Sequence, residues 1–357
     1  MENHSGLVDN FRDFKSNPDP IRHSLLPVRP VAKQKALVAA LGEQVGFDLY
    51  LLNDSNRPAP GKLAFSIADP KGVRHAIGAW DAPAFEKDRL SYLVRVNATS
   101  PALDCEGVWT TRFSLAGNEE TEHRREIWVV NPTPHRFNNL RVATLGLADE
   151  MAMQLKPIPG LRLEPFQQGG RYDVIIASPP TVHPTDTVHT DDVGADLRSH
   201  SIPPTELPAE IVAAFTSGTP LFVLCTSDGQ AMGAGPQLAT AAGFRCDGMV
   251  GSSRASWMGT WFFVRKHPVY DGLPVDRAMS IEYQVKGSDS NGLIVSGDGI
   301  EIVAAYSRDH DRRIGAGTFT WSDGGSRLLF HRITQMHRVF HRRLLSNSIR
   351  YLTERSV

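Results

Sequence analysis

The stretch Tyr172-Asp173-Val174-Ile175-Ile176-Ala177-Ser178 decides the fold class of the C-terminal part of the chain. It is a short apolar run, and residues 220–225 form a second one. Residues 207–215 and 236–242 have the spacing of short helices. Short apolar strands that alternate with helices predict a parallel sheet covered on both faces. We therefore expect a three-layer α/β domain over residues 138–357.

Upstream of this region the period of the sequence is two. Apolar side chains occupy alternate positions in residues 45–51, 63–67, 90–96 and 109–115. Such alternation predicts strands with one buried face, and turn-forming residues separate them. About seven antiparallel strands in roughly 100 residues are typical of an all-β, immunoglobulin-like sandwich. We expect that sandwich over residues 31–131, where the linker Asn131-Pro132-Thr133-Pro134 begins.

The composition argues against several classes of protein. The chain has 357 residues, 38 basic and 39 acidic side chains and a formal net charge of −1, whereas a dedicated nucleic-acid binder is usually clearly basic. No apolar run reaches the ~18–20 residues that span a bilayer, so we expect no membrane partner. The first residues lack the features of a signal peptide, which favours a cytoplasmic location unless a partner carries the chain across a membrane.

The three cysteines, Cys105, Cys225 and Cys246, match neither a disulfide framework nor a zinc site. Cys225 leads from a predicted strand into a turn, where a helix N-terminus would lower the pKa of a nucleophilic thiol. His331, at the end of another predicted strand, is the candidate base. The turn lacks the small flanking residues of a nucleophile elbow, and no acid follows His331 to orient it. A buried strand cysteine is the simpler interpretation.

Two loops carry further candidate ligand-binding residues. Arg254, Trp257 and Trp261 lie near glycines, and an indole ring there would pack on the apolar face of a sugar, unless Trp261 belongs to the core. Residues 183–200 are rich in His and Asp, which suit a divalent ion, but their spacing matches no defined metal cage. The sequence has no phosphate-cradling glycine loop and no HExxH motif, so we expect neither a metal nor a cofactor.

The two ends of the chain have distinct patterns. Residues 1–30 combine charged residues and several prolines with four large apolar side chains, Leu7, Val8, Phe11 and Phe14. Because proline fixes φ and removes amide donors, this region is predicted to be an extended tether that docks on something. Residues 336–352 predict an amphipathic helix whose basic residues form a solvated face.

Several stretches together resemble glycoside hydrolase family 2 enzymes, the β-galactosidase and β-glucuronidase group. Gly6-Leu7-Val8-Asp9-Asn10-Phe11-Arg12-Asp13-Phe14-Lys15 resembles the segment that closes the catalytic barrel of those enzymes. Residues 47–54 and 61–63 are similar to a β-sandwich that follows the barrel in long members. The last part resembles the ThuA-like, class I glutamine amidotransferase-like module, which also occurs in β-galactosidase trimerisation domains. The matching stretches are residues 172–176, 219–224, 267–274 and 344–352.

The resemblance implies a flavodoxin-like arrangement for the last domain and retaining hydrolysis of a β-glycoside for the assembly. The two catalytic glutamates of the family lie on the barrel, which would precede residue 1, so the resemblance gives this chain no catalytic residue. It implies the C-terminal portion of a family 2 enzyme, either a separate subunit, which Met1 favours, or a piece of a longer chain. Its partner in a hetero-oligomer would be a larger chain that bears the barrel. Leu7, Val8, Phe11 and Phe14 would dock on that barrel, because exposed apolar clusters are costly.

Two other functions stay open from the sequence. A stand-alone carbohydrate-binding or assembly protein would use the loop around Trp257. A self-sufficient hydrolase would use Cys225 with His331. The sequence does not name the sugar, since its recognition would depend mostly on the barrel.

Overall fold

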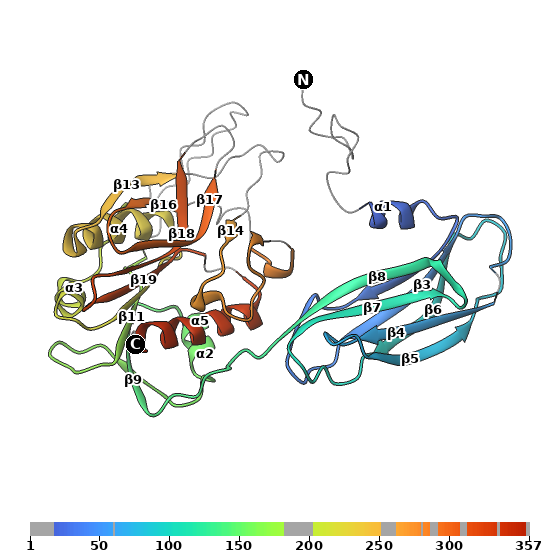
Figure 1. The fold of residues 1–357 in the computed structure, drawn as a ribbon, viewed down its shortest axis with the longest axis horizontal. Coiled ribbons are helices and arrows are strands. Elements are labelled where there is room, and N and C mark those ends of the chain that lie inside the picture. Colours follow the sequence, from blue (N-terminus) through green and yellow to red (C-terminus); the bar gives the residue numbers. More distant parts are fainter. Residues whose placement is uncertain are drawn as a thin grey trace, which may run out of the picture. The chain divides into compact units, whose positions relative to one another are not determined.

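The computed structural model describes residues 18–59, 61–181, 203–250, 262–279, 281–285, 292–307, 313–333 and 336–354. The chain divides into two compact units, Met1–Val130 and Asn131–Val357. Each unit is built on β-sheets, so the protein is a β-rich, multidomain chain (Figure 1). No described helix combines the length and the apolar composition that crossing a bilayer requires.

Unit 1 consists of two sheets, preceded by the helix α1 (Asp19–Ser24). One sheet has the strand order β1-β3-β6, and the other has the order β2-β8-β7-β4-β5. The strands are β1 (Val28–Gln34), β2 (Val38–Ala40), β3 (Gly46–Asn53), β4 (Lys62–Ala68), β5 (Arg74–Asp81), β6 (Ser91–Thr99), β7 (Gly107–Leu115) and β8 (Asn118–Val130). All neighbouring strands are antiparallel except β2 and β8.

The alternating sequence of unit 1 produces one core between its two sheets. Every second residue of β3 is buried, and the ring of Phe47 lies 4.9 Å from that of Phe65 on the other sheet. Phe65 also contacts Phe113 of β7 edge to face, at 5.7 Å between ring centroids. Burial of such inward-facing apolar side chains is what holds two sheets together.

Unit 2 is built on one mixed sheet of eleven described strands. Nine of them follow the order β10-β9-β11-β12-β19-β18-β17-β14-β15, and β16 pairs with both β13 and β18. The first five are parallel neighbours, and the pairs from β19 to β15 are antiparallel. The strands are β9 (Leu140–Leu145), β10 (Leu161–Pro165), β11 (Val174–Ala177), β12 (Leu221–Leu224), β13 (Arg245–Val250), β14 (Phe262–Val264), β15 (Arg277–Ala278), β16 (Gly292–Ser296), β17 (Ile300–Ser307), β18 (Ile314–Ser322) and β19 (Arg327–His331).

Helices cover both faces of the parallel strands. On one face, Ile211 and Leu238, from α3 (Ala209–Thr216) and α4 (Asp228–Ala242), share a core with Leu221 and Val223 of β12. The long helix α5 (Arg338–Thr353) contacts β11, β12 and β19, and none of its residues belongs to that core, so it covers the opposite face. It also contacts the short helix α2 (Asp149–Leu155), as Figure 1 shows. Two 3₁₀ turns, η1 (Pro268–Tyr270) and η2 (Ile281–Tyr283), complete the unit.

Two segments differ from the sequence predictions in extent. The helix α1 and the start of β1 lie within residues 1–30, where an extended tether was expected. Pro30 fits into β1 because this strand is at the sheet edge, where a missing N–H need not break the ladder. The helix predicted over residues 236–242 begins at Asp228, so Pro236 lies inside it.

The helix α5 is less solvated than its sequence predicts. His341, Arg343 and Asn347 are buried, whereas Arg338 and Arg350 are exposed. The prediction that the basic residues form one solvated face is therefore wrong for Arg343. Burial of this guanidinium is possible because its donors have partners within unit 2.

Candidate functional site

Most of the binding residues predicted from the sequence lie outside the described part of the chain. They are the sugar-contact candidates Arg254, Trp257 and Trp261, the docking residues Leu7, Val8, Phe11 and Phe14, and the His- and Asp-rich residues 183–200. Where side chains are described, no three His, Cys, Asp or Glu residues gather as they would around a metal ion. The remaining candidates are the strand ends of unit 2 and a cleft along α5.

The candidate pair Cys225 and His331 lies on opposite faces of the parallel sheet. In the register of β12 with β19, Leu224 pairs with His331. Side chains alternate between the faces of a sheet, and Cys225 points into the core beneath α3 and α4, together with Val223. His331 points to the other face, where its ring lies 6.3 Å from that of His341 on α5. The geometry supports the simpler interpretation of Cys225 as a buried strand residue.

Burial also shifts the pKa values of Cys225 and His331 in directions that disfavour nucleophilic catalysis. It raises the pKa of the Cys225 thiol far above its ordinary value, so little thiolate forms at neutral pH. It lowers the pKa of His331 to about 3. The Nδ1 of His331 lies 2.7 Å from the hydroxyl of Thr318, which lies 3.0 Å from the hydroxyl of Tyr270. This buried chain of polar side chains connects strand β19 to β18 and to η1.

One side chain joins the loops beyond the carboxyl ends of β11 and β12. Gln230, on the first turn of α4, is 1% exposed. Its Oε1 accepts hydrogen bonds from the N–H and the hydroxyl of Thr226, at 2.6 and 2.9 Å. Its Nε2 donates to the Pro179 carbonyl at 2.5 Å and to the Thr181 hydroxyl at 3.2 Å. Ligands of open α/β sheets usually bind beyond these strand ends, and here Gln230 ties the two loops together instead.

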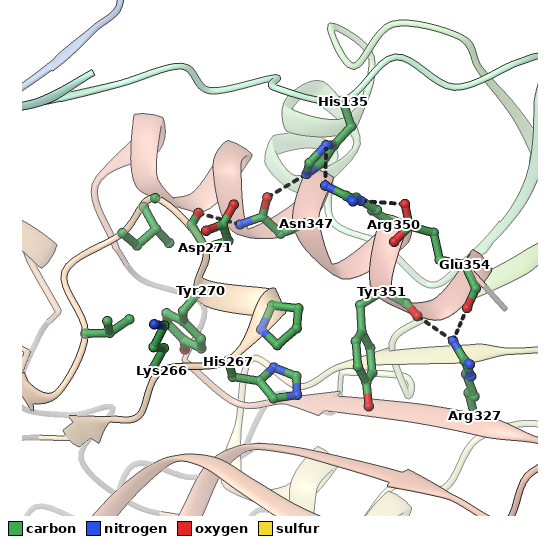
Figure 2. Close-up of a pocket in the computed structure, with 14 residues that line it drawn as sticks. His135, Lys266, His267, Tyr270, Asp271, Arg327, Asn347, Arg350, Tyr351 and Glu354 are labelled. Carbon is green, nitrogen blue, oxygen red and sulfur yellow. Dashed lines mark hydrogen bonds and ion pairs between the residues drawn. The ribbon is translucent and has the colours of Figure 1, made fainter. Parts of the chain in front are cut away.

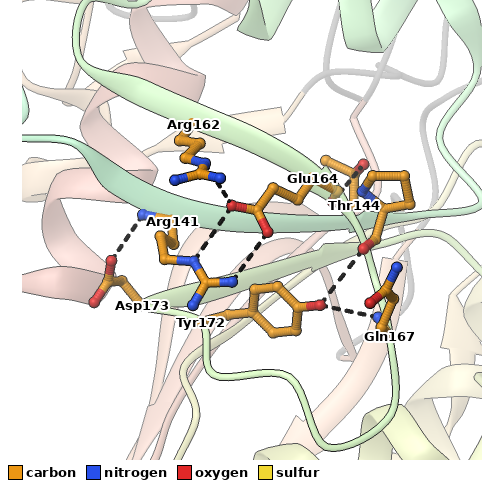
Figure 3. A network of polar contacts seen from close by, with 8 residues as sticks. Arg141, Thr144, Arg162, Glu164, Gln167, Tyr172 and Asp173 are labelled. Atoms are coloured by element: carbon orange, nitrogen blue, oxygen red, sulfur yellow. Dashed lines mark hydrogen bonds and ion pairs between the residues drawn. The ribbon is translucent and has the colours of Figure 1, made fainter.

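A network of charged side chains lies at the β10 edge of the same sheet (Figure 3). Arg141 of β9 donates to Glu164 of β10 at 3.3 and 3.0 Å, and Arg162 pairs with the same carboxylate at 2.8 Å. The hydrogen bonds from Arg141 hold the pKa of Glu164 below its ordinary value. The Arg141 guanidinium also lies 5.4 Å from the ring centroid of Tyr172. These groups are partly solvated and satisfy one another, so they stabilise an edge strand modestly and do not form a site.

A cleft of about 780 Å³ runs along the C-terminal half of α5 (Figure 2). Its walls come from η1 and the residues around it, from α5, and from the segment that contains His135. The lining residues are His135, Lys266, His267, Pro268, Tyr270, Asp271, Gly272, Leu273, Val275, Arg327, Asn347, Arg350, Tyr351 and Glu354. Two of the stretches that carry the family resemblance, residues 267–274 and 344–352, therefore meet at this cleft.

Asn347 is the central polar group of the cleft. Its Nδ2 donates to the carbonyls of Val269 and Asp271, at 3.2 and 2.9 Å, and its Oδ1 lies 2.9 Å from Nε2 of His135. Arg350 donates to Nδ1 of His135 at 3.4 Å, so His135 accepts at Nδ1 and donates from Nε2. Burial lowers the pKa of His135 and favours this neutral form. Asn347 thus connects α5, η1 and the segment that contains His135.

Arg343 lies one turn before Asn347 and supports the same junction. Its side chain is 6% exposed. Its Nε donates to the Asp271 carbonyl at 2.9 Å, and its Nη1 donates to the Asn131 carbonyl at 3.1 Å. The Asp271 carboxylate lies 3.5 Å from its Nη2. Since a buried guanidinium is costly without partners, these contacts fix where α5 sits against η1 and the start of unit 2.

His267, Tyr351 and Arg327 form the other side of the cleft. His267 accepts the Val269 N–H at Nδ1, at 3.1 Å, which directs its Nε2–H outward from η1. The Tyr351 ring meets the His267 ring edge to face at 4.9 Å, and the Arg327 guanidinium lies 6.0 Å from its centroid. Arg327 also donates to the carbonyls of Tyr351, at 2.8 Å, and of Glu354, which closes the last turn of α5. Within the described part of the chain, the Tyr351 hydroxyl has no hydrogen-bond partner.

The sequence carried one usable signal for this cleft. Ser346, Asn347 and Ser348 interrupt an apolar stretch of α5, and all three are buried. Buried polar groups usually have internal partners, and among the described residues the Asn347 side chain has them whereas the hydroxyls of Ser346 and Ser348 do not. That reasoning identifies Asn347 as a structural junction, but it does not identify His135 or Tyr351.

Neither a family profile nor a curated protein matches the chain. Among solved structures, a β-glucosidase from Listeria innocua in complex with glucose matches at 8% identity and a TM-score of 0.20, over 29% of this chain and 16% of that one. An alkylpurine DNA glycosylase from Pseudomonas fluorescens matches at 16% identity and a TM-score of 0.21, over 29% of this chain and 30% of that one. A DUF4785 family protein from Legionella pneumophila matches at 14% identity and a TM-score of 0.20, over 30% of each chain. The chain thus covers less than a third of each of these proteins, and TM-scores this low do not show a shared fold.

Proposed function

We propose that this chain is a non-catalytic C-terminal portion of a family 2 glycoside hydrolase. In this role it supports the retaining hydrolysis of a β-glycoside by a larger chain that bears the catalytic barrel. The order of the resembling stretches supports the proposal, because it runs from a barrel-closing segment through a β-sandwich to an amidotransferase-like module. The division of the chain at Val130 is compatible with that order.

The strand order of each unit suits a known type of fold. We infer that unit 1 is an immunoglobulin-like sandwich, because its two sheets share one core. We infer that unit 2 is a flavodoxin-like module. Counted from β9 along the chain, its parallel strands lie in the order 2-1-3-4-5, which is the order of flavodoxin-like sheets. The antiparallel strands from β18 to β15 are an addition to that pattern.

The separation of Cys225 from His331 is the observation that carries the non-catalytic assignment. Cysteine-dependent acyl transfer needs a thiolate and an imidazole within hydrogen-bond reach, about 2.6–3.2 Å. In this chain the sheet lies between the two side chains, and burial suppresses the thiolate. An amidotransferase-like module with this geometry is suited to assembly and support.

The chemistry itself is assigned to the partner. Retaining glycosidases use a nucleophile and an acid/base, two carboxyl groups about 5–5.5 Å apart. Both would be carried by the barrel, and no reaction step is assigned to this chain. Its contribution is the docking of Leu7, Val8, Phe11 and Phe14 on the partner.

Purification from the native cells through a tag on this chain tests the proposal. Native mass spectrometry should show a second, larger chain, and an aryl β-glycoside should be hydrolysed by the complex but not by this chain alone. Replacing both Phe11 and Phe14 by Asp should release the larger chain. The control Ile281→Asp, at a 75% exposed apolar side chain of unit 2, should leave the complex intact. A homo-oligomer alone, or hydrolysis by this chain that Cys225→Ala abolishes, would overturn the proposal.

A further inference from the structure

We propose that the cleft along α5 binds a neutral saccharide. The ligand would lie over Tyr351, between Lys266 at one end and the pair Arg350–Glu354 at the other, as laid out in Figure 2. Small-molecule sites occupy roughly 300–1,000 Å³, and the cleft volume of about 780 Å³ falls in this range. One or two pyranose rings would fit such a space.

The charges around the cleft favour a neutral ligand. Three cations line it against two carboxylates, namely Lys266, Arg327 and Arg350 against Asp271 and Glu354. Arg350 pairs with Glu354 at 2.6 Å, which removes most of the field of both groups. A site for a phosphate or a metal ion concentrates one sign of charge, whereas the positive and negative side chains that line this cleft are nearly equal in number.

The histidines of the cleft add hydrogen-bonding groups without adding charge. Burial lowers the pKa of His267 and of His135. Both rings are therefore neutral at physiological pH, and the hydrogen bonds from Arg350 and from the Val269 N–H fix their tautomers. A neutral ring with a fixed tautomer presents the same donor and acceptor to every ligand.

The cleft is pre-organised by its own hydrogen bonds. Asn347 and His135 use both of their polar ends within the protein, and Arg350 is held between His135 and Glu354. Side chains that are already fixed lose little entropy when a ligand binds. This matters for a sugar, because each of its hydroxyl groups gains little from a single hydrogen bond in water.

The cleft contains both polar groups that are able to form further hydrogen bonds and apolar side chains. The Tyr351 hydroxyl has no partner among the described residues, and the Lys266 side chain is exposed. Pro268, Leu273 and Val275 supply apolar surface next to them. A sugar ring matches this combination, because it carries hydroxyl groups at its edge and C–H groups on its faces.

This inference rests on the proposed function for the class of ligand, because a glycosidase assembly encounters saccharides. Its test uses the full isolated chain, so it does not depend on whether a barrel-bearing partner is found. Saturation-transfer NMR and isothermal titration would be done with four probes: lactose, cellobiose, glucuronate and inorganic phosphate. We expect lactose or cellobiose to bind in the millimolar range, and glucuronate and phosphate to bind more weakly.

Two substitutions locate the ligand. Tyr351→Phe and Lys266→Met should each weaken disaccharide binding at least five-fold, since each removes one hydrogen-bonding group from the cleft surface. The matched controls Tyr50→Phe and Lys62→Met, in unit 1, should leave binding unchanged. Circular dichroism of all four variants checks that the fold is retained.

Three results would overturn the inference. The first is no saccharide binding by the folded chain. The second is disaccharide binding that neither cleft substitution weakens, which would move the sugar site elsewhere, such as the loop around Trp257. The third is tighter binding of glucuronate or phosphate than of both disaccharides, which would make the cleft an anion site. None of these results bears on co-purification with a larger chain, so failure of this inference is distinguishable from failure of the proposed function.

Discussion

Replacing Gln230 by Leu tests whether one amide holds together the strand ends of unit 2. The substitution shortens the side chain by one bond, as it does in the control below, and removes four hydrogen bonds. Two of the partners are backbone groups, the Thr226 N–H and the Pro179 carbonyl, and they lose this partner in a buried region. An unsatisfied buried group costs about 1–3 kcal/mol. We therefore expect the free energy of unfolding of unit 2 to fall by about 4 kcal/mol.

Gln237 provides a matched control on the same helix. It is only partly buried, and its amide makes two hydrogen bonds with the backbone of Leu207, both at 2.9 Å. Water can replace these bonds, so Gln237→Leu should cost about 1 kcal/mol. Urea unfolding followed by circular dichroism measures both variants. Hydrogen exchange of the peptide that contains Thr226 shows whether the loss begins at the Gln230 site.

Gln230→Glu supplies a pH signature that a general packing defect would not give. At neutral pH its carboxylate would face the Pro179 carbonyl, which repels it, whereas the protonated acid can donate a hydrogen bond there. Burial and the carbonyl would raise the folded pKa above the ordinary value of about 4.3. The stability deficit relative to the natural sequence should therefore shrink as the pH falls from 7 to 5. Equal losses for Gln230→Leu and Gln237→Leu, or a deficit that is independent of pH, would refute this reasoning.

Three further predictions concern acid, backbone space and thiol chemistry. Burial lowers the pKa of His331 to about 3 and of His341 to about 4, against an ordinary value of 6.5, so the unfolded chain binds protons first. The full free energy of unfolding should be present above pH 6.5, and it should fall by about 3 kcal/mol for each histidine as the pH falls to 4. Urea unfolding at a series of pH values measures this, and a free energy of unfolding that does not change with pH would contradict it. Gly160 has a φ of +81° and would place a Cβ 1.9 Å from a backbone carbonyl oxygen, so Gly160→Ala should cost more than ~3 kcal/mol by the same urea assay. Gly169→Ala, with a φ of +79° and open space, should cost only ~1–2 kcal/mol, and equal losses would refute the close approach. Iodoacetamide should modify Cys225 only after unfolding, and peptide mass spectrometry locates the modified residue. Rapid modification of Cys225 in the native chain would show that the thiol is accessible.

The strands of unit 1 were predictable because alternating burial is a local property of the sequence. Residues 63–67 lie in β4 and residues 109–115 lie in β7, where buried side chains alternate with partly buried ones. The strand β5 was not recognised, because no residue on it is fully buried and Gly78 lies at its centre. In the fold, the Trp80 ring occupies the space beside Gly78, which lies two residues earlier on the same face of the strand.

The full extent of α4 was hidden from local sequence reasoning. It contains Pro236 and several glycines, which disfavour helix in isolation. These small residues serve close packing: a Cβ on Gly233 would lie 2.3 Å from the Thr205 carbonyl oxygen, and one on Gly235 would lie 2.6 Å from Leu293. Tertiary contacts of this kind outweigh helix propensity, and they involve residues far away in the sequence.

The candidate site was less predictable than the fold, because it depends on register and on distant pairs. The positions of Cys225 and His331 at strand ends were predicted, but their opposite faces follow from the pairing of β12 with β19. The cleft requires His135 and Asn347 to meet although they are 212 positions apart in the sequence, and no local pattern signals that contact.

The contact between His135 and Asn347 also sets an order of events during synthesis. The two residues are 212 positions apart. Ribosomes add roughly 5–20 residues each second, so the segment with His135 emerges about 10–40 s before α5 does. The strand β12 ends 114 residues before α5 begins, so for about 6–23 s of that interval the faces of β11 and β12 that α5 covers have no partner in the nascent chain. The yield of folded protein should therefore respond to translation speed downstream of β12, and a chaperone that shields apolar strands would be needed most in that window.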